Sequence, residues 1–287
     1  METPDIAILA LTSLAGGIIS SIIGMGGGMM LYAVMLLFME PVVAIPLHGI
    51  VQLASNISRV FFQREYLNWK IIGSFSLLVV PMSFLGIAIA QQLPASILRL
   101  IIGIFVIIAT WVPAEMLLRA QAVPTEPDRS LEMSILRSRW QTAPIDLWVT
   151  VVLDKEQSRP ATPYKRFIWL GGVAGFLNAA VGFAGAFTGP FFLNLGLSRF
   201  ALVGTKATCH AFAHLSKSFA FGLAGFSFLD WGILLALLSL SGAIGTWIGN
   251  HLLHKVDEDI FMALYKWVLT LIGIRLLLKE LGPLLLF

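Results

Sequence analysis

Residues 6–39 read IAILALTSLAGGIISSIIGMGGGMMLYAVMLLFM, and none of these 34 residues is charged. A helix needs about 20 apolar residues to cross the hydrocarbon core of a bilayer, so this run is too long for one crossing. The cluster Gly24-Met25-Gly26-Gly27-Gly28 interrupts it. The run therefore predicts a membrane helix of ordinary length followed by a short one.

The composition of the whole chain is that of an integral membrane protein. Of its 287 residues, 57% are hydrophobic and 12% are charged, whereas soluble domains carry about 25% charged residues. A soluble protein of this size could not bury so much apolar surface, so membrane lipid is an expected partner. The net charge of +3 comes with no basic run, which indicates no nucleic-acid partner. The single cysteine, Cys209, excludes an internal disulfide.

Charge divides the chain into two membrane halves. Residues 119–166 contain eight basic residues, six acidic residues and five prolines, which predicts a polar linker. We therefore expect a first transmembrane repeat over 1–118, a cytoplasmic linker over 119–166 and a second transmembrane repeat over 167–287. The predicted fold is an all-α membrane protein of eight to ten membrane segments, ten if each broken run is two helices. The segments are 6–39, 41–62, 71–91, 97–118, 167–198, 200–223, 231–253 and 260–278.

The two halves align with each other at a shift of 158 residues. The shift places Gly24 on Gly182, Gly27 on Gly185, Ser58 on Ser216, Asn56 on His214 and Arg59 on Lys217. A polar cluster thus recurs at the same distance from a glycine break. This recurrence predicts an internal duplication.

The distribution of basic residues predicts that the repeats are inverted. Cytoplasmic loops collect Lys and Arg. Arg64 and Lys70 follow the second segment, and the linker is basic, so both are expected inside, whereas residues 224–230 carry no basic residue. Inverted repeats are common in secondary transporters. They require an odd number of crossings in each half, so each broken run is expected to be a hairpin, with the N-terminus outside.

The glycine breaks are candidate anion sites. Broken helices at membrane depth are tolerated where the freed backbone groups line a cavity, and a helix N-terminus carries partial positive charge. We expect Gly24, Gly26, Gly27 and Gly28 to form one wall of a pocket. The other wall is expected to be formed by Gly182, Ala184, Gly185, Gly189 and Pro190. The alternative is close packing of helices through small residues, as at Gly24/Gly28, Gly182/Ala186 and Gly245/Gly249.

Polar side chains on the next segment of each half are the second candidate set. In the first half Gln52, Asn56 and Arg59 share one helical face. Buried ionisable groups in membranes usually face a cavity or each other, so the basic residues predict anion binding and the histidines hydrogen bonding or proton uptake. In the second half His210, His214 and Lys217 repeat this spacing, and Lys206 lies one turn before them. Ser216, the equivalent of Ser58, is a further candidate.

Structural roles compete with these functional ones. Arg59 and Lys217 would bind nothing if they snorkelled to the interface. His210 and His214 would serve equally as structural hydrogen-bonding groups, and Lys206 lies near a helix start, where it could be interfacial. The chain contains no Walker loop, no HExxH and no nucleophile elbow, so we expect neither an enzyme nor a metal site.

Together these features resemble the TauE/SafE family of sulfite exporters, over nearly all of both membrane halves. The order and spacing of the motifs carry the resemblance, since no single motif is specific. The second break departs from the glycine-rich form of the first, with Ala184 and Ala186 in place of glycines. The matching motifs are Gly24 to Gly28, Pro46-Leu47-His48-Gly49, the Gln52/Asn56/Arg59 face, Asn68-Trp69 and Gly204-Thr205-Lys206-Ala207-Thr208.

The resemblance implies export of sulfite, sulfoacetate or a similar small anion from the bacterial cytoplasm across the inner membrane, without a cofactor. Membrane potential, with the inside negative, or proton coupling through a histidine would drive it. Two alternatives stay open: import of a small organic or sulfur-containing anion, and a non-transporting assembly or helper protein. The sequence leaves the oligomeric state open, a homodimer included.

Overall fold

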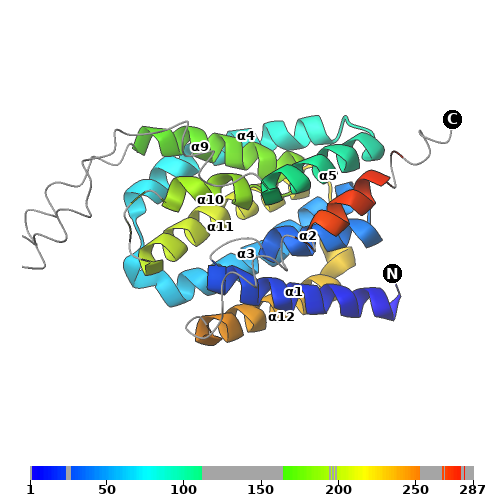
Figure 1. The fold of residues 1–287 in the computed structure, drawn as a ribbon. Helices are drawn as coiled ribbons and strands as arrows, with labels where there is room; N and C mark the ends of the chain where they lie inside the picture. Colours follow the sequence, from blue (N-terminus) through cyan, green and yellow to red (C-terminus); the bar gives the residue numbers. More distant parts are fainter. Residues whose placement is uncertain are drawn as a thin grey trace, which may run out of the picture.

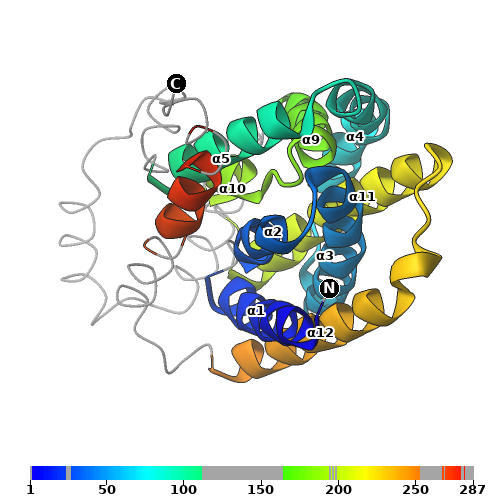
Figure 2. The ribbon, with the colours of Figure 1, turned by 90° about the vertical axis from the view of Figure 1, so that its right-hand side faces the viewer.

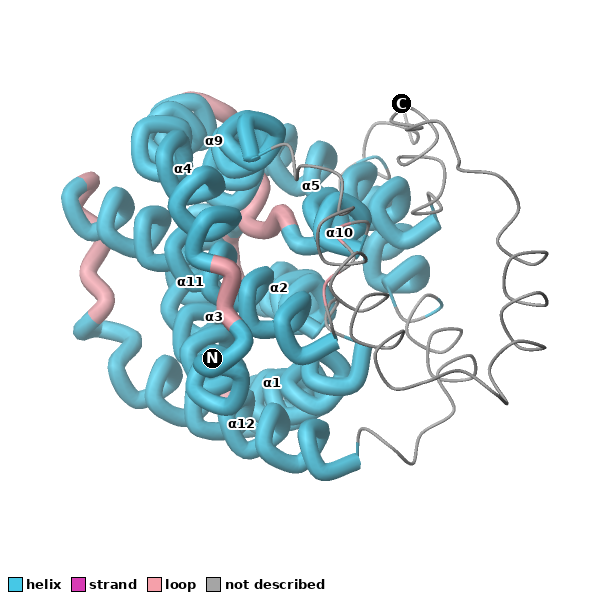
Figure 3. The backbone as a smooth tube through the Cα atoms, turned by 90° about the vertical axis from the view of Figure 1, so that its left-hand side faces the viewer, coloured by secondary structure: helices cyan, strands magenta, loops and turns pink. Residues whose placement is uncertain are grey.

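The predicted apolar segments are helices in the computed structural model, as far as the described residues reach. These residues are 2–23, 27–111, 164–193, 195, 197, 199–252, 267, 269–278 and 281. Helices and loops account for all of them, and no strand occurs in this part of the chain (Figure 3). The expectation of an all-α membrane protein is confirmed.

Five helices build the first half and at least four build the second. The first half has α1 (Thr3–Ile23), α2 (Gly27–Phe38), α3 (Pro41–Gln63), α4 (Trp69–Ala90) and α5 (Ala95–Trp111). The second half has α9 (Tyr164–Ala180), α10 (Gly185–Leu193), α11 (Arg199–Leu223) and α12 (Gly232–Leu252). Residues 269–278 are helical as well, and 3-10 turns at Arg64–Tyr66 and Leu229–Trp231 lie in the connections after α3 and before α12.

Both long runs are broken where the sequence predicts. A 21-residue α1 precedes a 12-residue α2, and a 17-residue α9 precedes a nine-residue α10. Local chemistry marks other ends: Pro41 occupies the first turn of α3, where no backbone N–H is needed. The Asn68 side chain caps α4 by accepting from the Ile71 N–H at 3.2 Å.

Four of the described helical stretches are long and apolar enough to cross a bilayer: Thr3–Ser21, Pro41–Tyr66, Trp69–Ala90 and Leu229–His251. Gly27–Phe38, Ala95–Ile108 and Leu269–Leu278 are shorter apolar helices. The 25-residue α11 is long enough but carries Lys206, His210, His214 and Lys217, all buried, which lowers its hydropathy. Its polar face is turned into the protein.

The helices of the two halves pack in reciprocal pairs. The pair α1 and α12 packs along its length, and so does the pair α4 and α9. Exchanging each helix for its repeat equivalent turns one pair into the other. Figure 1 shows the helices lying roughly along a common direction, and Figure 2 shows α2, α3 and α11 between the two outer pairs. A duplication would produce this pairing, and both the duplication and the inverted orientation of the halves stay predictions.

Glycines allow the outer pairs to approach closely. A Cβ at Gly171 of α9 would overlap the Phe75 carbonyl of α4, and one at Gly245 of α12 would overlap the Leu14 carbonyl of α1. A Cβ at Gly249 would lie 2.6 Å from the Ile18 carbonyl oxygen. The packing interpretation is therefore correct for Gly245 and Gly249.

The predicted linker lies almost wholly outside the described residues. Its last three residues, 164–166, form the start of α9. The boundaries of the two repeats otherwise stay a prediction.

Candidate functional site

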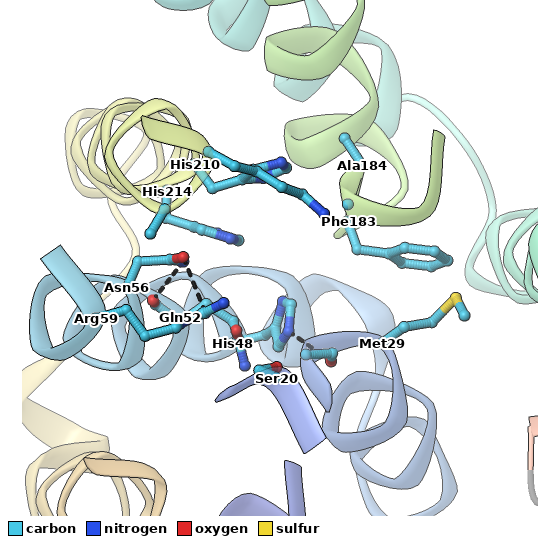
Figure 4. Close-up of a pocket in the computed structure, with 14 residues that line it drawn as sticks. Ser20, Met29, His48, Gln52, Asn56, Arg59, Phe183, Ala184, His210 and His214 are labelled. Carbon is cyan, nitrogen blue, oxygen red and sulfur yellow. Dashed lines mark hydrogen bonds between the residues drawn. The ribbon is translucent and has the colours of Figure 1, made fainter. Parts of the chain in front are cut away.

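A cavity of about 60 Å³ lies where the two helix breaks meet α3 and α11. In Figure 4, His48, Gln52 and Asn56 on α3 lie across from His210 and His214 on α11, and Phe183 and Met29 lie at the end away from Arg59. We call this cavity the central pocket. It is lined by Ser20, Gly28, Met29, His48, Gln52, Asn56, Arg59, Phe183, Ala184, Gly185, Lys206, Ala207, His210 and His214.

The starts of α2 and α10 both open onto the central pocket. A Cβ at Gly28 would lie 2.7 Å from Oε1 of Gln52, so the missing side chain lets this carboxamide reach the backbone. A Cβ at Gly185 would meet only Cε1 of His210, at 3.9 Å. Since unpaired N–H groups and partial positive charge gather at helix N-termini, both ends favour an anion.

Arg59 brings a buried guanidinium to one end of the pocket. Its side chain is 8% exposed, so it does not snorkel to water. Its Nη2 donates to Oδ1 of Asn56 at 2.9 Å, and its Nε donates to the Ser55 carbonyl at 3.4 Å. Asn56 in turn donates to the Gln52 carbonyl at 2.8 Å. This network holds the charge beside the cavity.

The α11 side of the pocket presents one lysine and two histidines. Lys206 is 5% exposed, so its side chain is buried inside the protein. Nε2 of His210 lies 2.8 Å from the Thr188 hydroxyl, and Nδ1 of His214 lies 3.3 Å from the Asn178 amide nitrogen. Among the described lining residues that are Asp, Glu, Lys or Arg, Arg59 and Lys206 are both basic, which favours an anion in the cavity.

Lys217 takes a different position from its repeat equivalent Arg59. Its side chain is fully buried, yet it does not line the central pocket. The ammonium donates to the Gly182 carbonyl at 3.0 Å and lies 3.5 Å from Oδ1 of Asn178. Both acceptors lie at the C-terminal end of α9, where a cation is favourable. In this structure Lys217 therefore holds the second break.

The remaining predicted residues are distributed between packing and the pocket. Gly27 packs against α1, since a Cβ there would overlap the Gly16 carbonyl. Gly182 has a φ of +100° and lies against the Tyr32 ring. Ser216 is buried away from the pocket lining, and Gly24 and Gly26 lie outside the described residues.

His48 is the site residue that the sequence reasoning missed. Its Nδ1 lies 3.0 Å from the Gly182 carbonyl oxygen and its Nε2 lies 2.9 Å from the Gly28 carbonyl oxygen, so it joins the two breaks. The sequence did contain a signal for His48, because the shift of 158 residues aligns it with Lys206, a candidate substrate-binding residue. Ser20 is likewise equivalent to Asn178. Ala184, an expected wall residue, lines the pocket. Met29, Phe183 and Ala207 complete the wall, and their apolar side chains carry no comparable signal.

The family comparison agrees with this geometry. The family described as Sulfite exporter TauE/SafE matches residues 9–276, nearly the whole chain. The chain belongs to the TauE/SafE family. Membership makes it an integral membrane protein of a family of anion exporters, which are transporters rather than enzymes. Searches of curated proteins and of solved structures returned no match for this TauE/SafE chain.

Proposed function

We propose that this TauE/SafE protein exports sulfite or a closely related small anion from the cytoplasm and binds it in the central pocket. The observation that carries the proposal is the wall of that pocket. Its charged residues, Arg59 and Lys206, are both basic and both come from the central helices α3 and α11. A cavity of this kind at membrane depth favours an anion over a cation or a neutral solute.

The neighbouring groups suit an oxyanion with several acceptor oxygens. The carboxamides of Gln52 and Asn56 and the ring nitrogens of His210 and His214 supply donors at the same cavity. The backbone N–H groups at the start of α10 add donors without formal charge. Such an arrangement replaces the hydration of an anion with directional hydrogen bonds.

The size of the pocket favours sulfite over the larger sulfoacetate. A cavity needs about 10–15 Å³ to hold one water, so about 60 Å³ accommodates roughly four to six waters. Sulfite is comparable with a few waters in size. Sulfoacetate adds a carboxymethyl group, which would require the walls of the pocket to move apart.

Membrane potential suffices to drive export. A charge crossing the membrane gains about 2.3 kcal/mol per 100 mV. With the inside negative, this is worth a roughly forty- to fifty-fold concentration ratio for a monoanion. The reciprocal pairs α1–α12 and α4–α9 support two inverted halves that enclose one site, as alternating access requires. Proton coupling through His210 or His214 is an additional prediction.

Sulfite flux in reconstituted vesicles tests the site. Arg59→Gln and Lys206→Gln each remove one charge-assisted hydrogen-bond donor, worth about 1.5–3 kcal/mol, which corresponds to a roughly 10- to 150-fold loss of affinity. Lys70→Gln is the matched control, because Lys70 is exposed and does not line the pocket. Unchanged flux in both pocket variants would remove the proposed site.

The same vesicles separate the competing functions. Oriented vesicles that accumulate sulfite only in the import direction would establish an importer. No flux of sulfite or other small anions by purified, folded protein would favour an assembly or helper protein. Measuring the molecular mass in detergent would decide whether the transporting unit is a homodimer.

A further inference from the structure

Two more cavities continue from the central pocket toward the end of α3. The first, which we call the neck, has a volume of about 10 Å³, and Arg59, Phe62, Gln63, Phe200 and Asn250 form part of its wall. The second, the vestibule, has a volume of about 410 Å³. It lies at the turn Arg64–Tyr66, beyond the end of α3.

Shared walls show that these cavities form one series. Arg59 lines both the central pocket and the neck. Phe62, Gln63, Phe200 and Asn250 line both the neck and the vestibule. At about 1.5 Å per residue, the series extends about 20 Å from Gln52 on α3 to Tyr66 in the turn that follows α3. The three cavities therefore lie next to one another, in series from the buried site to this end of the bundle.

The neck is the narrow part of the series. Its volume of about 10 Å³ is at most the space of one water, whereas the central pocket holds several. An anion cannot pass unless side chains at the neck move. Arg59 is the side chain common to both spaces, and its hydrogen bonds go to Ser55 and Asn56 on its own helix. Rotation of this one long side chain changes the opening without moving a helix.

Charge and aromatic rings distinguish the two ends of the central pocket. At the vestibule Arg64 and Glu65 carry opposite charges, so the net positive charge increases inward to Arg59 and Lys206. At the other end the Phe183 ring packs against Tyr32 at 5.8 Å and Phe105 at 5.1 Å between centroids. Figure 4 places Phe183 away from Arg59. The ring-packed end presents no charged lining residue to an anion.

We propose that the vestibule and the neck are the route by which the anion reaches the central pocket from the cytoplasm, with Arg59 as the gate. This inference rests on the proposed function. The loop with Arg64 and Lys70 is the one predicted inside, so the vestibule opens to the cytoplasm. The guanidinium of Arg59 attracts the anion from either side of the neck. Its side chain turns as the anion passes, which keeps a counter-charge beside the anion throughout.

Cysteine labelling tests the route. Cys209 is the chain's one cysteine and is fully buried, so Cys209→Ala supplies a background without thiols. Asn250→Cys and Gln63→Cys place a thiol at the junction of neck and vestibule. Lys70→Cys is the control. It places an exposed thiol in the loop predicted on the same cytoplasmic side, outside the walls of the three cavities.

The reagent is a membrane-impermeant sulfonated maleimide, added to vesicles with the cytoplasmic face outward and removed before sulfite is supplied, because sulfite itself reacts with maleimides. We expect labelled Asn250→Cys and Gln63→Cys to lose most of their sulfite flux. Labelled Lys70→Cys should keep its flux. Binding of sulfite, measured by thermal shift, should persist in the labelled variants, since the label lies outside the central pocket.

Full labelling at both neck positions with unchanged flux would overturn the route, and so would inhibition only from the opposite face. If one cysteine variant fails to fold, the other carries the test. Absence of sulfite flux from the unlabelled Cys209→Ala protein and from the native chain would count against the proposed function itself, which distinguishes the two failures.

Discussion

Replacing Gly182 with alanine tests the geometry of the second helix break. Gly182 has a φ of +100°, which an alanine adopts at a cost of about 1–3 kcal/mol. The new methyl would also overlap Cζ of Tyr32 and would lie 2.6 Å from its Oη. Tyr32 is fully buried and packs against His48 and Phe183, so its ring cannot turn away without displacing them. Overpacking of this kind costs about 1–3 kcal/mol.

Gly225→Ala is a matched control for this change. Gly225 has a φ of +91°, but a Cβ there meets nothing within 4 Å. Both substitutions reduce the entropy of the unfolded chain equally, so this contribution cancels in the comparison. Gly182→Ala should therefore lower the free energy of unfolding by about 1–3 kcal/mol more than Gly225→Ala.

Unfolding in mixed detergent micelles, followed by tryptophan fluorescence, measures this difference. Tyr32→Leu removes the ring, so it should reduce the loss of unfolding free energy caused by Gly182→Ala. A double-mutant cycle would detect this reduction as coupling between the two positions. Sulfite flux should also fall further in Gly182→Ala, because its carbonyl holds His48 and Lys217. Equal destabilisation by the two alanines, with no coupling to Tyr32, would refute the reasoning.

Three further predictions concern packing, burial and ligand size. Gly171→Ala should lower the free energy of unfolding by about 1–3 kcal/mol, because its methyl would overlap the Phe75 carbonyl. Gly73→Ala is the control, because a Cβ there would meet nothing within 4 Å, and it should be neutral or stabilising by up to about 1 kcal/mol. Equal changes in the free energy of unfolding for Gly171→Ala and Gly73→Ala would contradict the packing of α4 on α9. Cys209 should resist maleimide in the folded protein and react after denaturation, so rapid native labelling would contradict its burial. In a thermal-shift assay sulfite should stabilise the protein more than sulfoacetate at equal concentration, and the reverse order would contradict the size argument.

Positions that the predicted internal repeat aligns need not share a role. The shift of 158 residues pairs Arg59 with Lys217, and both are buried cations on central helices. Arg59 lies at the cavity, whereas Lys217 holds the end of α9 through Asn178 and Gly182. Two identical halves would place both charges alike.

The sequence by itself determined the membrane class, the positions of the helices and the two breaks. Long uncharged runs and clusters of glycine are local properties, and a helix in lipid must satisfy its backbone hydrogen bonds within the segment. For the same reason the shared face of Gln52, Asn56 and Arg59 could be predicted, since helical spacing fixes which side chains of one helix point together.

Only the tertiary structure decided which of these faces meet, and at what distance. Spacing along α3 does not say that His48 reaches the carbonyls of Gly28 and Gly182, because these atoms come from three separate segments. Helical spacing also does not predict that the Lys217 ammonium contacts the end of α9, or that the neck lies next to the central pocket. Those contacts depend on the packing of α3 against α11 and on glycines that let backbones approach, which are long-range properties of the folded chain.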